Sequence, residues 1–267
     1  MQGSAREAGR HTIGAAVVGW MVLYAAGCGT ADSFLIPVDD SATKTIGTQS
    51  CAAAPAPDEA DTLVVLVWDG GMSDQVRARA LSPFDALALD FVDAEPVVGD
   101  LDGLFREAVL ARVRAILCSL DPMDVAVVEG AADEYADATI VHICGDEPFA
   151  GGKHIGQADF DPCNEHADDS VVIWGGALAT RIGGATFGEW VNAFANTTAH
   201  EIGHTLGFAH PNEETLASLL PVPGAEVMRS KVTVSQLLGE QNFLLEQETC
   251  PGAAPGEGSY RLLSVDD

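Results

Sequence analysis

The chain has 267 residues and a formal net charge of −27, from 13 lysine and arginine residues against 40 aspartate and glutamate residues. Nucleic acids and anionic membrane surfaces are therefore poor partners, because they carry the same sign of charge. The length allows one large domain or two small ones, each with a buried core.

Residues 1 to 27 are predicted to be an export signal. Arg6 and Arg10 supply the positive start, and an uncharged run of 16 residues then leads into Cys28. This run is shorter than the roughly 20 residues of a membrane span, which makes a retained membrane anchor the weakest alternative. The ending AAGC resembles a bacterial lipobox, with Ala25 where leucine is most common. We expect either a cell-envelope lipoprotein, attached to the membrane only through a lipid on Cys28, or a secreted protein.

The rest of the chain divides by composition. Residues 28 to 61 are rich in alanine, proline, serine and threonine and show no helix or strand periodicity, which predicts a tether or a short pro-segment. One folded domain is expected from 62 to 250, with residues 251 to 267 as a C-terminal tail.

The first half of this domain is predicted to contain several strands and one long helix. A β-branched run at 62 to 68 predicts a buried strand, and residues 86 to 92 fit either a strand or a helix. Apolar residues at helical spacing predict a helix from 101 to 117, packed on a sheet. Further strands are predicted at 124 to 130, at 138 to 144, weakly around 155 to 160, and at 171 to 174.

Two more helices are marked by capping signals in the second half. Thr186 and Glu189 form a capping-box pair at the start of a helix whose apolar stripe faces the core. His200 falls about 200° from Ile202 around this helix, so the histidine face points away from the stripe and can line a cleft. A second capping pair begins a last helix predicted over 233 to 247.

The stretch HEIGHTLGFAH, at 200 to 210, carries the chemistry. It has the pattern HExxHxxGxxH, in which His200 and His204 lie on one face of a helix and can bind one metal ion. Gly207 can take the left-handed conformation that ends a helix, which brings His210 round as the third ligand. Three imidazoles leave one position of a zinc ion open for water, and Glu201 is the candidate general base.

At these residues the chain resembles the metzincin clan of zinc metallopeptidases. The resemblance implies an α+β fold, with a twisted mixed sheet and two long helices above the cleft, and a small C-terminal subdomain with one helix. It also implies a methionine turn beneath the metal, for which Met228 is the match. Some metzincins have a tyrosine two residues later, but this chain has Ser230 there, and no tyrosine role is transferred.

The remaining metal-binding residue types are weaker candidates. His142 lies in a hydrophobic strand and fits a core histidine better than a ligand. A second cluster contains His154, Asp159, Asp161 and His166, in the region where matrixins bind a second zinc ion and calcium. The spacing here does not reproduce the matrixin pattern, so structural Ca²⁺ is a secondary candidate cofactor beside Zn²⁺.

The cysteines fit export into an oxidising compartment. Without Cys28, five remain, and their pairing cannot be deduced from sequence: Cys51, Cys118, Cys144, Cys163 and Cys250. Cys144 and Cys163 flank one loop and are the first candidate pair. Cys51 either bridges to Cys250 or acts as a zinc-binding thiol that resembles the matrixin cysteine switch, although most of that signature is missing.

These observations predict a monomeric, exported zinc endopeptidase that cleaves protein or peptide substrates with zinc-activated water. An extended peptide would add to the edge strand near 155 to 160. The loop from 211 to 224 either walls an apolar substrate pocket or packs in the core. Two alternatives remain: a non-catalytic zinc-bearing surface lipoprotein, and a hydrolase of a non-peptide amide.

Overall fold

The computed structural model describes a large part of the predicted domain. The described residues are 55–68, 83–89, 91–93, 100–120, 124–145, 154–161, 164–211, 216–217, 219–220, 225–247 and 260–262. The predicted signal, Cys28 and most of the predicted tether lie outside these residues, so the domain boundaries stay predictions. Within the described part, no helix is both long and apolar enough to cross a membrane.

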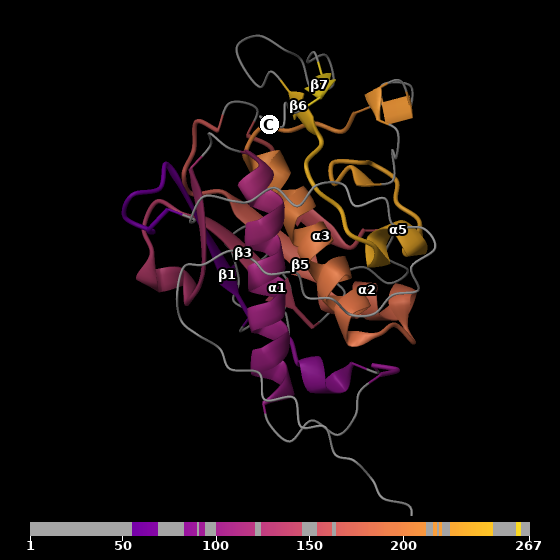
Figure 1. Cartoon of the computed structure of the whole chain (residues 1–267). Coiled ribbons are helices and arrows are strands. Elements are labelled where there is room, and N and C mark those ends of the chain that lie inside the picture. Colours follow the sequence, from indigo (N-terminus) through magenta and orange to yellow (C-terminus); the bar gives the residue numbers. More distant parts are fainter. Residues whose placement is uncertain are drawn as a thin grey trace, which may run out of the picture.

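A five-stranded sheet forms the centre of the fold (Figure 1), in the order β2-β1-β3-β5-β4. All neighbouring strands are parallel except β4, which runs antiparallel to β5 at one edge. The strands are β1 (Thr62–Val67), β2 (Val125–Glu129), β3 (Thr139–Cys144), β4 (Gly156–Ala158) and β5 (Ser170–Trp174). Five of the predicted strands are therefore confirmed. Four of them are β-branched runs, which suit the buried strands of a parallel sheet, whereas β4 is a short edge strand.

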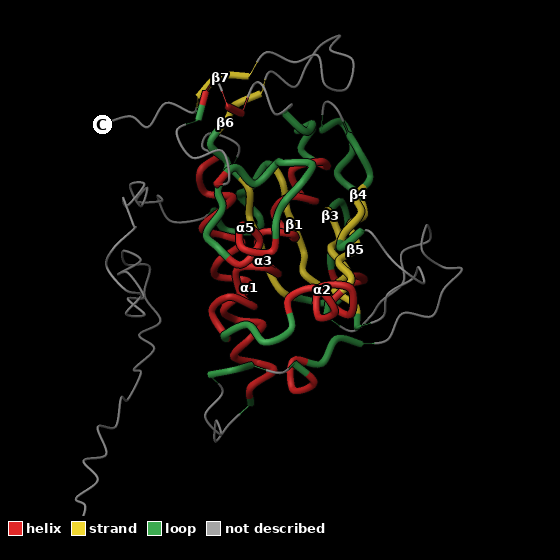
Figure 2. Tube along the Cα trace, turned by 90° about the vertical axis from the view of Figure 1, so that its right-hand side faces the viewer, coloured by secondary structure: helices red, strands yellow, loops and turns green. Residues whose placement is uncertain are grey.

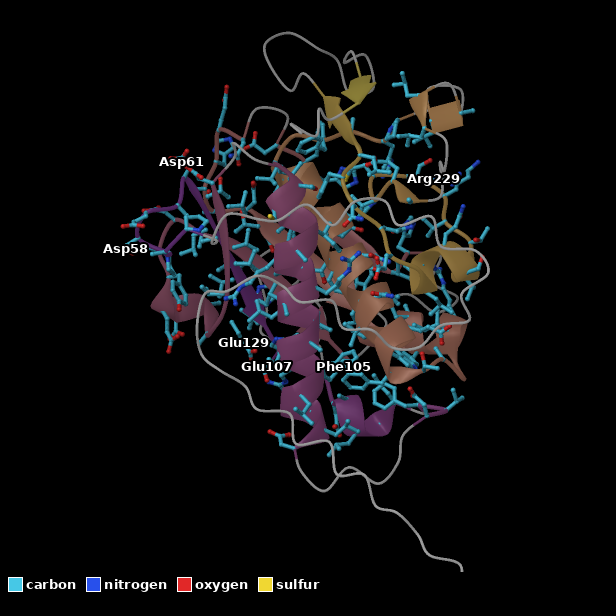
Figure 3. All side chains as sticks on the ribbon, in the orientation of Figure 1. Asp58, Asp61, Phe105, Glu107, Glu129 and Arg229 are labelled. Atoms are coloured by element: carbon cyan, nitrogen blue, oxygen red, sulfur yellow. The ribbon has the colours of Figure 1, made fainter. Side chains whose placement is uncertain are left out.

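Two long helices lie on the same side of this sheet (Figure 2) and pack against each other. They are α1 (Leu101–Leu117), which has the predicted bounds, and α3 (Phe187–Thr205). Aromatic side chains fill the space between them, with the rings of Phe105 and Phe194 5.3 Å apart at an angle of 85°. Figure 3 shows Phe105 on α1. This core holds α3 firmly against the sheet.

Two segments between these elements differ from the prediction. The described residues of the range predicted as a strand or a helix, 86–89 and 91–92, contain neither a strand nor a regular helix, but a single 3₁₀ turn, η1 (Ala86–Ala88), begun by the Asp85 side chain. A helix that the sequence analysis missed, α2 (Gly175–Ile182), follows β5 without a loop. A Cβ atom on Gly175 would lie 2.8 Å from the Cys144 carbonyl oxygen, so the close strand-to-helix junction requires glycine there.

The C-terminal part contains much less helix than predicted. Instead of spanning 233 to 247, α5 (Val234–Leu238) has five residues and stops at Gly239. The chain beyond it is extended because residue Asn242 exchanges backbone hydrogen bonds with the segment before Met228. A small antiparallel pair follows, β6 (Leu245–Gln247) with β7 (Tyr260–Leu262). The capping pair of Thr233 and Gln236 is present as predicted.

One predicted disulfide is wrong. Cys144 is a buried thiol in β3, which contradicts the expected bridge to Cys163. Cys51, Cys163 and Cys250 lie outside the described residues, so the other pairings stay predictions.

Candidate metal centre

The helix that carries the histidines begins and ends where its local sequence dictates. Thr186 caps its start, because the Thr186 backbone N–H donates to the Glu189 carboxylate at 2.8 Å while the Glu189 N–H donates to the Thr186 hydroxyl at 3.3 Å. At the other end Gly207 has a φ of 89°, a left-handed conformation that favours glycine. Its N–H donates to the His204 carbonyl at 3.1 Å. The chain therefore leaves the helix immediately after the second histidine.

This exit brings the three motif histidines together. The Nε2 atom of His210 lies 3.0 Å from Nε2 of His200 and 3.1 Å from Nε2 of His204. Among the described residues, these three form the only set of three or more His, Cys, Asp or Glu side chains whose ligand atoms all lie within 4.8 Å of one another. Bonds of 2.0–2.1 Å from tetrahedral zinc would separate two ligand nitrogens by about 3.3 Å. The spacing of the imidazoles thus fits a zinc ion.

The outer nitrogens of two of these rings are held by backbone carbonyls. Nδ1 of His200 lies 2.7 Å from the Val227 oxygen, and Nδ1 of His204 lies 2.8 Å from the Phe208 oxygen. A carbonyl oxygen can only accept, so both Nδ1 atoms carry the hydrogen and both Nε2 atoms present lone pairs. This is the tautomer that a metal ligand needs, with its orientation fixed from behind.

All three rings are in the neutral form that a metal requires. Burial above all, together with the nearby His204 and His210, lowers the pKa of His200 to about 3 in spite of the Val227 hydrogen bond, which raises it. Burial also lowers the pKa of His204. Burial, together with the neighbouring His204, lowers the pKa of His210 to about 4. Protons therefore do not compete with a cation for these nitrogens at neutral pH.

Glu201 is buried beside this cluster, with 8% of its surface exposed. Burial raises the pKa of its carboxyl to about 8. Its side chain lies directly against Gly156 in β4, since a Cβ atom on that glycine would be 2.6 Å from Oε1 and 2.7 Å from Cγ of Glu201. The edge strand of the sheet and the candidate base are therefore in contact. Sequence reasoning did not find Gly156, because a glycine in a short strand carries no signal of what packs on it.

Met228 is buried and packs against Gly203 of α3. A Cβ atom on Gly203 would collide with the Met228 sulfur and would lie 3.1 Å from the Phe243 ring. Only glycine fits between the two histidines at this position, because the methionine and the phenylalanine occupy the space that a side chain would need. Arg229, the next residue, lies on the same side of α1 as α5 (Figure 3), and Ser230 is exposed.

The second predicted cluster does not form a metal-binding set within the described residues. The Asp161 carboxylate accepts the His166 N–H at 2.7 Å, and the Asp159 carboxylate accepts the Ser170 N–H at 3.3 Å. Each carboxylate therefore accepts a hydrogen bond from a backbone N–H of the same loop. Calcium binding stays a prediction. Sequence analysis missed Asp169, whose pKa is raised to about 6 by burial and then by Asp161 and Asp159.

The loop after the third histidine is described only in part. Leu216 and Leu220 are buried and pack with partly buried Leu219 and Leu244 in a small cluster. This packing is what the core-packing alternative expects of these residues, and the predicted pocket wall stays a prediction. The residues 212–215, 218 and 221–224 lie outside the described part.

No protein-family model matches the chain, and no curated protein matches it. Among solved structures, archaemetzincin from Methanopyrus kandleri is similar over 69% of this chain and 89% of that chain, with a TM-score of 0.36 and 13% sequence identity. This likeness is too low to place the chain in a family. The described part of the chain has a mixed α/β fold and a three-histidine cluster.

Proposed function

We propose that this chain is a zinc-dependent endopeptidase of the metzincin type. His200, His204 and His210 would hold the metal, and Glu201 would be the general base. The observation that supports this most directly is the convergence of three neutral imidazoles, with Nε2 atoms 3.0 and 3.1 Å apart, beside a buried carboxyl group. A structural histidine cluster has no need of this arrangement, since nitrogen lone pairs that face one another repel without a cation.

Each protein group has a defined part in the proposed reaction. A bound zinc ion supplies Lewis-acid chemistry, in that it polarises a carbonyl group and lowers the pKa of water to about 7. Glu201 accepts the proton of the attacking water and passes it to the amine of the departing peptide. Burial raises the pKa of this carboxyl in the metal-free chain, and a cation held by the three histidines would lower it again, so that Glu201 would be in the carboxylate form that accepts the proton.

The edge strand β4 is the proposed place for an extended substrate. It ends the sheet on the side of the histidine helix and pairs only with β5 in the described sheet. A peptide that adds to this edge forms backbone hydrogen bonds with little dependence on its sequence. Because Gly156 of β4 touches Glu201, such a peptide would pass close to the candidate base.

Metal analysis and peptidase assays test the proposal together. Purified protein should contain close to one equivalent of zinc, and His204→Ala should lose it. The zinc-loaded protein should cleave casein or members of a peptide library, and a chelator should stop the cleavage. Glu201→Gln should keep the zinc and lose about 10² to 10⁴-fold in kcat, the usual contribution of a general base. Protein with less than about half an equivalent of zinc, unchanged by His204→Ala, would contradict the metal site.

The same variants separate the two alternatives. A non-catalytic zinc-bearing lipoprotein would leave every peptide intact, and Glu201→Gln would change nothing measurable. A hydrolase of a non-peptide amide would depend on Glu201 but would cleave no peptide in the library. The position of Glu201 beside the histidines favours catalysis, since a protein that only binds zinc needs no base there.

The proposal includes export, with Cys28 as a lipidated N-terminus or with simple secretion as the alternative. It rests on the pattern of residues 1 to 28 alone. Mass spectrometry of the mature N-terminus distinguishes the two forms. A chain that retains residues 1 to 27 would contradict both.

A further inference from the structure

A buried carboxylate lies two residues before Met228. Glu226 has only 1% of its surface exposed, and both of its oxygens accept backbone hydrogen bonds. Oε1 accepts the Met228 N–H at 3.1 Å, and Oε2 accepts the Leu244 N–H at 2.8 Å. Its carboxylate thus joins the methionine segment, 225–228, to the extended chain at 241–244.

The 241–244 segment is itself well anchored. The Asn242 oxygen accepts the Val227 N–H at 3.0 Å, and the Asn242 N–H donates to the Ala225 oxygen at 2.9 Å. On its other side, Nη2 of Arg112 in α1 donates to the Gln241 oxygen at 2.9 Å. The methionine segment is therefore bound to a strand that α1 holds in place.

One peptide group connects Glu226 to a candidate metal ligand. The N–H of Met228 and the carbonyl of Val227 belong to the same planar peptide unit, in which they point in opposite directions. Glu226 accepts from the N–H side, while the carbonyl accepts the Nδ1–H of His200 at 2.7 Å. Rotation of this plane would move the carbonyl away from His200. A carboxylate on the N–H also polarises the peptide and makes its oxygen a stronger acceptor.

From this geometry we propose that Glu226 is a positioning residue for His200. Its carboxylate holds the Val227–Met228 peptide so that His200 keeps the hydrogen on Nδ1 and directs the Nε2 lone pair toward the metal. The inference rests on the proposed function, because it concerns the metal that the three histidines would hold. It adds a residue outside the HExxHxxGxxH pattern on which the affinity of that site depends.

The test substitutes Glu226→Gln in the full-length chain. Glutamine has the same shape, but its amide NH₂ must face one of the two backbone N–H groups, so one hydrogen bond is lost. Partners that orient metal-ligating histidines contribute about 10- to 100-fold in affinity. Because Glu226 acts one step further out, zinc affinity by chelator competition should fall about tenfold. The visible spectrum of the Co²⁺-loaded protein should also change, since it reports the ligand geometry.

Asp102→Asn is the matched control. The Asp102 carboxylate also joins two segments, because it accepts the Ala86 N–H at 2.8 Å and pairs with Arg106 at 2.6 Å, and none of these groups contacts the histidines. It should lose stability without a change in zinc affinity or in the Co²⁺ spectrum. Glu226→Asp is the second variant, since it keeps the charge but cannot span both N–H groups, and it decides the question if the glutamine variant does not fold.

The outcomes separate this inference from the proposed function. Wild-type protein that binds no zinc contradicts the proposed function and everything that rests on it. Wild-type protein that binds zinc, with Glu226 variants of equal affinity and an unchanged Co²⁺ spectrum, overturns only the role of Glu226. An equal loss of affinity in Asp102→Asn would also overturn it, because the effect would then follow from stability alone.

Discussion

The contact between Gly156 and Glu201 makes a quantitative prediction. Alanine at position 156 would place a Cβ atom 2.6 Å from Oε1 and 2.7 Å from Cγ of Glu201, where ordinary contacts begin at 3.4 Å. The carboxyl must therefore shift by about 0.8 Å, since Gly156 is paired with Ile173 in the sheet and Glu201 is on the firmly packed α3. Misplacement of a catalytic group by about 1 Å costs roughly 10²-fold. We expect kcat/KM of Gly156→Ala to fall by about this factor, or about 2.7 kcal/mol.

The assay compares kcat and KM on one cleaved peptide with zinc content measured on the same sample. Zinc content should stay at the wild-type value, because the three atoms nearest to the added Cβ atom all belong to the base, Glu201. Gly183→Ala is the control, since its Cβ atom would meet only the Ala179 oxygen, at 3.7 Å, in ordinary contact. Its activity should equal that of the wild type.

A zinc-loaded Gly156→Ala protein with wild-type kcat/KM would refute this reasoning. It would mean either that Glu201 moves without consequence, and so is not the base, or that the edge strand yields at no cost. Loss of zinc in the same variant would refute it differently, because the substitution would then act on the metal site.

Three further predictions concern the supports of the site. Gly207→Ala should destabilise the protein by about 1 kcal/mol, because a φ of 89° is unfavourable for alanine, and should weaken zinc binding, because this turn carries His210. Thermal unfolding measures the stability and chelator competition measures the zinc affinity. Unchanged values of both would contradict the role of the turn. Asp169 has a pKa of about 6 against 3.8 in the unfolded chain, so its ionisation opposes folding progressively as the pH rises through that window. Asp169→Asn should therefore raise Tm at pH 7.5 but not below pH 4, and a lower Tm at pH 7.5 would contradict this. Thr186→Ala removes the cap shared with Glu189 and should lower the free energy of unfolding by about 1 kcal/mol, measured by denaturant titration. The kcat for peptide cleavage should stay unchanged. Equal stability of the variant and the wild type would show that the cap contributes nothing.

Local patterns in the sequence predicted the elements that depend on local forces. The bounds of α1, the strands β1 to β3 and β5, and the two capping boxes follow from periodicity and from hydrogen bonds within a few residues. The length of the final helix was overestimated, because part of the predicted helix, near Asn242, pairs instead with residues 225 to 227. Residues 225 to 227 carry no sequence pattern that would predict this pairing. The sequence analysis missed α2 because its first two residues are glycines, which are poor helix formers.

The sequence by itself determined which residues could form a metal centre, since HExxHxxGxxH places two histidines on one helical face and a glycine where the chain must turn. Only the tertiary structure decided how those residues are held. The nitrogens of His200 are oriented by the Val227 carbonyl, and the Glu201 carboxyl lies against Gly156, through contacts between segments far apart in the chain. Such contacts depend on how the sheet, α3 and the C-terminal segment pack together, and no local spacing encodes that packing.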